Sequence, residues 1–236
     1  KRGSVDDLKR KMIPGVIVGL VLGVVVFALG ARNIYGLLAF VFAGFAAALN
    51  ISEYAIGVRA RQAAHGESVI AALFGLFSGN RRRYGGYVAH LGIIVVAIGV
   101  AASSTFRTER EAVLKPGETM TLGRVTARLK DVWAREEPQR AVIGATMELI
   151  ADGVPYAVLS PRMNIYPMSE QPIPTPDVRS TPFGDTYMNL MSFREDGSSA
   201  TIKIINEPLV PWIWLGGGII CLGAVISSGW RSRKVA

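Results

Sequence analysis

Four apolar segments interrupt a chain in which charged and polar residues otherwise recur. They run from about residue 14 to 30, 34 to 56, 86 to 104 and 209 to 228. Each is close to the roughly 20 residues that an α-helix needs to cross the hydrocarbon core of a bilayer. A three-residue linker separates the first two, so we expect these to form an antiparallel hairpin. The pattern predicts an α-helical membrane protein with about four transmembrane helices.

The stretch between the third and fourth apolar segments has a different period. From Val125 to Lys130, apolar and polar residues alternate, and TIKII repeats the pattern before the last apolar segment. Asp152-Gly153 and Asp196-Gly197 are typical of hairpin turns, and Pro116-Gly117 of a further turn. The sequence therefore predicts a small all-β domain, either a barrel or a sandwich, inserted between helices three and four.

Two segments depart from these patterns. Residues 160–184 hold half of the twelve prolines, so we expect an extended, non-helical loop over the surface of the β domain. Residues 68–77 (SVIAALFGLF) are apolar but too short to cross a bilayer. They predict an amphipathic segment that lies at the membrane interface.

The basic residues predict the orientation. They cluster before the first span, between spans two and three, and after the fourth, and all three clusters fall on one side if each span crosses once. By the positive-inside rule that side is the cytoplasm, so the β domain faces the periplasm of a bacterium. Outside residues 106–207, 14 basic residues face 4 acidic ones, whereas 106–207 hold 12 and 14. The net charge of +8 thus reflects membrane orientation, and we expect no nucleic-acid binding.

These observations divide the chain into seven parts at the bacterial inner membrane. We expect a cytoplasmic N-terminal segment at 1–12, a transmembrane hairpin at 13–57, a cytoplasmic connection with the interfacial segment at 58–85, a transmembrane helix at 86–105, a periplasmic β domain at 106–207, a C-terminal transmembrane helix at 208–230 and a cytoplasmic tail at 231–236. Lys1 stands where Met is usual, which is compatible with a mature, trimmed or truncated N-terminus. The opening KRGSVDDLKRKM lacks the form of a cleavable signal peptide.

Glycines recur at helical spacing in two of the spans. Gly15, Gly19 and Gly23 form a doubled G-x-x-x-G, and Gly85, Gly92 and Gly99 recur every seven residues. Small residues at these spacings favour close packing against another helix. The single cysteine, Cys221, excludes a disulfide within the chain, and no C-x-x-C-H motif is present.

The third span carries a histidine, His90, about 10 Å along the helix from Arg83. An imidazole within hydrocarbon needs a hydrogen-bond partner, a proton path or a metal. It could bind haem iron, or it could bond to a Ser, an Asn or a backbone carbonyl of a neighbouring helix. Gly86 and Tyr87 share its face one turn earlier, and Ile93 and Ile94 one turn later. A glycine there leaves room for a flat macrocycle with the isoleucines at its rim.

The only other histidine, His65, lies in the cytoplasmic connection and is expected to be a solvated loop residue. A haem with two histidine ligands inside the membrane would therefore need its second ligand from elsewhere. Arg81 to Arg83 are first of all topology determinants, although Arg83 could also pair with a haem propionate. Trp212 and Trp214 are expected in an interfacial aromatic belt or, alternatively, beside an external haem platform. Met163 and Met168 are expected to pack or to contact a partner.

Two motifs give the chain a family resemblance. NRRRYGGYVAHLG before the third span, and PLVPWIWLGG before the fourth, flank the expected outer domain. In this order they resemble the C-terminal part of the CcmF family, the haem lyases of system I cytochrome c maturation. The resemblance implies that His90 is an axial ligand of a transmembrane haem b. The family's tryptophan-rich segment and its other haem-binding histidines have no match here, so the chain resembles a split C-terminal subunit or a fragment.

The resemblance also implies a function and partners. The chain is expected to help a haem lyase form the thioether bonds between haem and apocytochrome c. Its expected partners are the N-terminal CcmF portion, a haem carrier protein, and apocytochrome c with its thiol-reducing chaperones. The alternative is a non-catalytic assembly protein whose β domain recruits these partners. A transporter component is a third reading, but Glu53 is almost the only charge within the spans.

Overall fold

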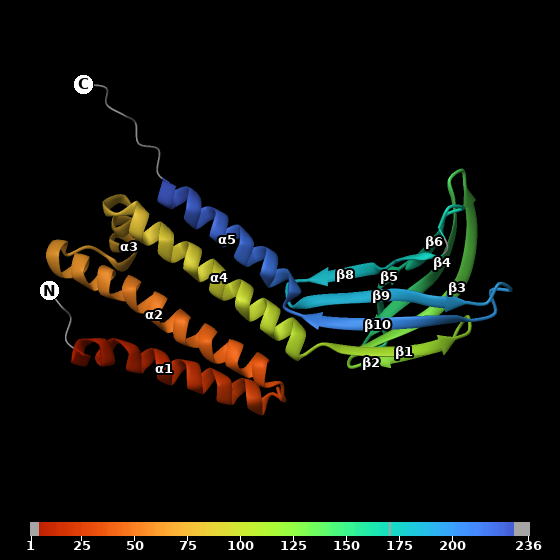
Figure 1. Ribbon diagram of the computed structural model, residues 1–236, viewed down its shortest axis with the longest axis horizontal. Helices are drawn as coiled ribbons and strands as arrows, with labels where there is room; N and C mark the ends of the chain where they lie inside the picture. Colours follow the sequence, from red (N-terminus) through yellow and green to blue (C-terminus); the bar gives the residue numbers. More distant parts are fainter. Residues whose placement is uncertain (1–4, 170, 229–236) are drawn as a thin grey trace, which may run out of the picture. The chain divides into compact units, whose positions relative to one another are not determined.

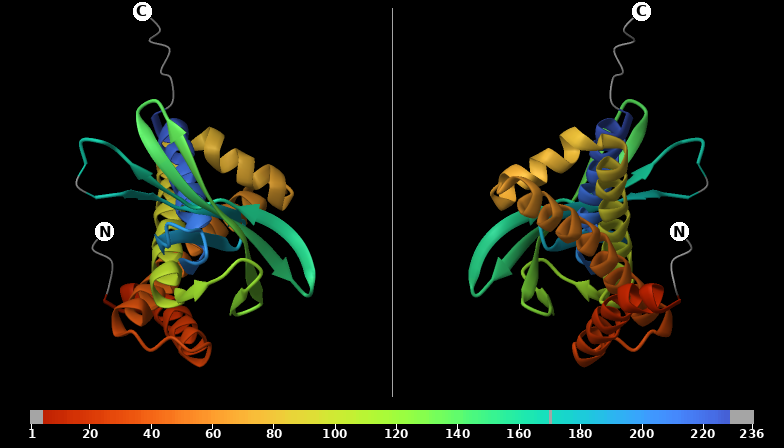
Figure 2. Two further views of the ribbon diagram at one scale, coloured as in Figure 1. Left: turned by 90° about the vertical axis from the view of Figure 1, so that its right-hand side faces the viewer. Right: turned by 90° about the vertical axis from the view of Figure 1, so that its left-hand side faces the viewer.

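The computed structural model describes residues 5–169 and 171–228 of the 236-residue chain. The expected cytoplasmic tail at 231–236 lies outside these residues. The chain divides into two compact units, a helical one from residues 1–105 and 209–236 and a β unit from residues 106–208. Both units are drawn in Figures 1 and 2.

The helical unit contains five helices, which are α1 (Val5–Ala28), α2 (Ile34–His65), α3 (Val69–Gly79), α4 (Arg81–Thr105) and α5 (Val210–Ser228). Of these, α2, α4 and α5 are long and apolar enough to cross a membrane, whereas the apolar part of α1, Met12–Ala28, is shorter. The predicted fold class, several apolar helices with a β domain, is confirmed.

Helix α2 continues through Arg59 and Arg61 to His65, beyond residue 57 at which the predicted hairpin ends. It begins at Asn33, whose side-chain oxygen accepts hydrogen bonds from the backbone of Tyr35 and Gly36. It ends at Gly66, which adopts the left-handed conformation with φ of 63°. The helix runs past the apolar segment because Ala, Arg and Gln are good helix formers, and it ends where Gly66 provides a left-handed cap.

Glycine stripes hold the helices together in two pairs, α1 with α2 and α4 with α5 (Figure 1). A Cβ atom on Gly92 would lie 2.6 Å from the carbonyl oxygen of Gly216 and 2.7 Å from the backbone nitrogen of Ile220. A Cβ atom on Gly19 would lie 2.5 Å from the carbonyl oxygen of Val41. These backbones approach so closely that only glycine fits, and the predicted role of both glycine stripes in helix packing is confirmed.

The β unit contains two antiparallel sheets. One has the strand order β1-β10-β9-β8, and the other β2-β3-β4-β6-β7 with β5 paired to β4. Their strands are β1 (Thr108–Leu114), β2 (Thr119–Leu122), β3 (Val125–Glu137), β4 (Arg140–Ala151), β5 (Val154–Leu159), β6 (Arg162–Ile165), β7 (Ile173–Thr175), β8 (Asp177–Thr181), β9 (Gly184–Phe193) and β10 (Ala200–Pro208).

Both sheets contribute to one core. Ala127, Leu129 and Met147 come from the second sheet and Met188 and Ile202 from the first, and all five are fully buried. The alternation seen in the sequence from Val125 onward therefore places its apolar residues between the sheets, which makes this unit a sandwich.

Two of the predicted turns connect paired strands, and the third, Pro116-Gly117, lies between β1 and β2 of different sheets. Asp152 and Gly153 join β4 to β5 with φ of 51° and 79°, the pair of positive values that a type I′ hairpin turn requires. Gly197 lies in the β9–β10 turn. Residues 160–169 and 171–184 are non-helical and largely extended, as predicted. They are more ordered than a plain loop because parts of them form β6, β7 and β8.

Candidate functional site

A groove of about 350 Å³ lies between α2 and α4. Its walls are mainly apolar, with two polar residues from α2 and two from α4. The lining residues are Phe45, Ala46, Leu49, Asn50 and Glu53 of α2, and Tyr87, His90, Ile93 and Ile94 of α4. The exposure of His90 and Ile93 shows that the groove is open along one side.

Four of the residues that the sequence singled out come together here. Tyr87, His90, Ile93 and Ile94 line the groove because residues three and four apart share one face of α4. Gly86 does not line it, and a Cβ atom there would meet open space. Within the described part of the chain, the His90 side chain has no hydrogen-bond or ion-pair partner. The alternative in which it bonds to a neighbouring helix is therefore not seen in this conformation.

Asn50 was missed by the sequence analysis. Its side chain is only 7% exposed, and its Nδ2 donates to the carbonyl oxygen of Tyr87 at 3.0 Å. Its Oδ1 is buried without a hydrogen-bond partner. Since buried polar atoms are nearly always hydrogen-bonded, this oxygen marks the groove wall as a place where a donor fits.

A charged cluster lies at the end of the groove nearest the start of α4. Arg83 Nη2 donates to Glu53 Oε2 at 2.6 Å, and the Tyr87 hydroxyl donates to the same oxygen at 3.1 Å. Arg83 Nε in turn donates to the Tyr87 hydroxyl at 3.2 Å. The guanidinium is therefore already paired with a carboxylate of α2, which the sequence did not anticipate as its partner.

The groove suits one face of a flat, largely apolar group that carries a metal. It offers an exposed imidazole and apolar walls from Phe45, Leu49 and Ile94, and the buried Asn50 Oδ1 behind its surface has no partner among the described residues. Imidazole is a common ligand of iron, copper and zinc. Among residues 5–169 and 171–228, no group of three or more His, Cys, Asp or Glu could hold a bare metal ion.

The β unit has an apolar groove of its own, of about 390 Å³, with Met163, Pro174, Met191 and Phe193 in its lining. Met163 is buried in the core, as expected for packing, whereas Met168 is 98% exposed. In the helical unit, Trp214 on α5 is 80% exposed.

Comparisons with known proteins relate both units to one family. Residues 105–208 match a family described as CcmF C-terminal beta-sandwich. The chain is 28% identical over 166 residues to the cytochrome c-type biogenesis protein CcmF of Haemophilus influenzae, and 29% identical over 163 residues to that of Pseudomonas aeruginosa. These alignments cover 70% and 69% of this chain and 25% of each relative, so the chain spans about a quarter of their length.

A solved structure named "Cytochrome c Heme Lyase CcmF" has the same fold, with a TM-score of 0.73 and 23% sequence identity. The match covers 96% of this chain and 35% of that one, and therefore includes helices that precede the sandwich and the helix that follows it in the sequence. The resemblance inferred from the two sequence motifs is confirmed: the chain is similar to the C-terminal part of CcmF.

Proposed function

We propose that this chain is a component of the membrane haem lyase of cytochrome c maturation, in which His90 is one axial ligand of a haem b. The observation that carries the proposal is the position of His90. The imidazole has no partner among the described residues and lies exposed in an apolar groove between α2 and α4, which are both long enough to cross a membrane. Burying it in hydrocarbon unpaired would cost several kcal/mol, and ligation of iron removes that cost.

The groove residues have separate roles in this proposal. His90 presents one unprotonated ring nitrogen to the iron, since only the neutral imidazole can ligate. Phe45, Leu49 and Ile94 exclude water from that face, and Asn50 Oδ1 accepts a hydrogen bond from a group in the groove. The haem, once bound, supplies one-electron chemistry. Because the groove is open on one side, the second ligand comes from another part of CcmF, which is the chain's expected partner.

The orientation follows from the charges. With the basic clusters in the cytoplasm, the sandwich of residues 106–208 lies in the periplasm of a bacterium, beside the haem carrier and apocytochrome c. There the lyase joins the two apocytochrome thiols to the haem vinyl groups. This chain contributes the membrane ligand and the outer sandwich to that reaction.

The proposal is tested with the chain purified together with its natural partner subunits. We expect the reduced-minus-oxidised absorption spectrum to show a six-coordinate b-type haem, and His90→Ala to abolish that signal. His65→Ala is the matched control, since His65 ends α2 outside the groove. An unchanged spectrum in His90→Ala would exclude ligation by this residue.

A second candidate function is protein docking by the sandwich, without a role in haem ligation. It is favoured by the exposed apolar residues of the β unit, among them Met168 and Phe183, which are 98% and 79% exposed. Photo-crosslinking from position 168 in intact membranes tests it. Capture of the haem carrier or of an apocytochrome, combined with an unchanged haem spectrum in His90→Ala, would favour docking alone.

A further inference from the structure

Helix α3 has two apolar faces, and only one of them packs against the protein. Ala72 and Leu76 are buried in a cluster with Val58 of α2 and Tyr84 of α4. On the other side Ile70 is 70% exposed and Phe74 71%, with the exposed Val69 and Leu73 beside them. Four neighbouring exposed apolar side chains on an 11-residue helix indicate a surface that contacts a membrane or another protein.

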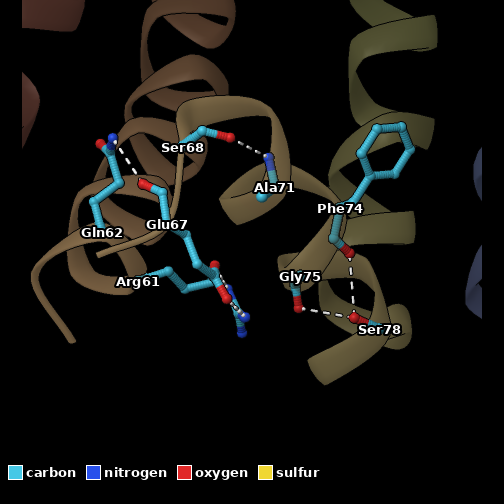
Figure 3. Close-up of polar contacts among 8 residues, drawn as sticks. All are labelled: Arg61, Gln62, Glu67, Ser68, Ala71, Phe74, Gly75 and Ser78. Carbon is cyan, nitrogen blue, oxygen red and sulfur yellow. Dashed lines mark hydrogen bonds and ion pairs between the residues drawn. The ribbon is translucent and has the colours of Figure 1, made fainter. Parts of the chain in front are cut away.

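The connection between α2 and α3 fixes this orientation (Figure 3). Arg61 holds Glu67 with two hydrogen bonds, of 2.9 Å from Nε and 2.6 Å from Nη2. Ser68 accepts a hydrogen bond from the backbone nitrogen of Ala71 and caps α3. The Arg61 guanidinium also lies against Gly75, where a Cβ atom would collide with it. Helix α3 therefore cannot roll to bury its exposed face without breaking these contacts.

Exposed arginines precede and follow α3 in the sequence. Arg59 near the end of α2, and Arg81 and Arg82 at the start of α4, are exposed and have no acidic partner among the described residues. By contrast, Arg61 and Arg83 are each paired with a glutamate. A protein partner covering an apolar helix face does not need three free guanidinium groups on the two helices that adjoin it in the sequence, whereas the head groups of an anionic bilayer pair with them.

The chain connection brings α3 to a membrane surface. Helices α2 and α4 are both long and apolar enough to span, and α3 joins the end of one to the start of the other. With 11 residues α3 is about 16 Å long, too short to cross the ~30 Å hydrocarbon layer.

We propose that α3 is an interfacial helix. Ile70 and Phe74, with Val69 and Leu73, enter the acyl-chain region, and Arg59, Arg81 and Arg82 bind anionic phospholipid head groups. This anchors the membrane ends of α2 and α4, the two helices that form the groove. The proposal is independent of haem ligation by His90.

Spin labelling of the full chain, copurified with its partner subunits, tests the proposal. In a Cys221→Ser background, single labels are placed at Ile70→Cys and Phe74→Cys, and at the matched control Ala64→Cys on the exposed last turn of α2. The samples are nanodiscs of phosphatidylcholine with phosphatidylglycerol. We expect collisions with oxygen to exceed those with a nickel chelate several-fold at 70 and 74, and the reverse at 64.

Two results would overturn the insertion of α3. Frequent collisions with the nickel chelate at 70 and 74 would place the face in water, and rare collisions with both reagents would place it under a protein partner. The contact with anionic head groups is tested separately. We expect the ratio of oxygen collisions to nickel-chelate collisions at position 74 to fall when the nanodiscs contain phosphatidylcholine alone. The double substitution Arg81→Gln/Arg82→Gln should make this ratio the same in both lipid compositions. If the chain that keeps Arg81 and Arg82 gives the same collision ratio in both lipid compositions, the proposed contact with anionic head groups is wrong. All the substituted side chains are exposed, so folding is not at risk.

Discussion

At the scale of single residues, Asn50 is a buried polar side chain that the described residues of the helical unit satisfy only in part. Its Nδ2 bonds to Tyr87, but its buried Oδ1 has no partner, although such an atom costs about 1–3 kcal/mol. The same side chain lines the groove that holds His90. We infer that, in the assembled protein, this oxygen accepts a hydrogen bond from His90 or from a group bound in the groove. Removing a group that orients a metal ligand through a hydrogen bond typically lowers metal affinity about 10- to 100-fold.

Asn50→Leu is therefore expected to separate folding from haem binding. Removing an unpaired oxygen together with one hydrogen bond should change the free energy of unfolding by about 1 kcal/mol or less. Haem affinity should fall about 10-fold, as measured by titrating haem into the apo assembly. Ser52→Ala, an exposed position on the same helix, is the control. Equal affinities in both variants would show that the amide has only a packing role.

Glu109 on β1 gives a prediction for pH. A hydrogen bond from Lys203 on β10, with a further one from Arg107, lowers the pKa of this carboxyl group below its usual range. A group with a depressed pKa stabilises the fold above its unfolded pKa of about 4.3, and that contribution is lost as pH falls through the folded pKa. We expect NMR titration of the Glu109 side chain to show a midpoint below 4.3, and Lys203→Gln to raise it. A normal midpoint in the unsubstituted chain would contradict the pairing.

At the scale of elements, α4 carries glycines of two kinds. A Cβ atom at Gly92 would meet the backbone of α5, whereas one at Gly86 would meet nothing within 4 Å. We therefore expect Gly92→Ala to destabilise the helical unit by about 1–3 kcal/mol through overpacking. Gly86→Ala should be neutral or gain up to about 1 kcal/mol from helix propensity. Thermal unfolding of the apo assembly in detergent checks both, and equal shifts would refute the close α4–α5 contact.

Much of each element could be predicted from the sequence because its signals are local. The apolar runs, the seven-residue spacing of Gly85, Gly92 and Gly99, and the Asp152-Gly153 turn each depend on neighbours within a few residues. The α2 side of the groove could not be predicted this way. Glu53 and Arg83 pair across 30 residues, and no periodicity within either helix says that these faces meet. Strands β7 and β8 could not be predicted this way either, because they are defined by their pairing with β6 and β9.

At the scale of the whole molecule, the proposed haem site needs more than this chain. Its two histidines lie on different helices, and only His90 lines the groove. Since the chain covers about a quarter of its CcmF relatives, the opposing ligand is expected from the remainder of that protein. A haem with one imidazole ligand is five-coordinate and high-spin, whereas a second imidazole makes it six-coordinate and low-spin.

The chain produced alone and loaded with haem is therefore expected to give a high-spin spectrum that depends on His90. Adding the N-terminal CcmF portion should convert that spectrum to low-spin, because the open side of the groove is then closed by a second ligand. Absorption and resonance Raman spectra follow the change in spin state. His65→Ala is the decisive control for the isolated chain. A low-spin haem without the partner, lost in His65→Ala, would show that both ligands come from this chain and that the groove alone does not form the site.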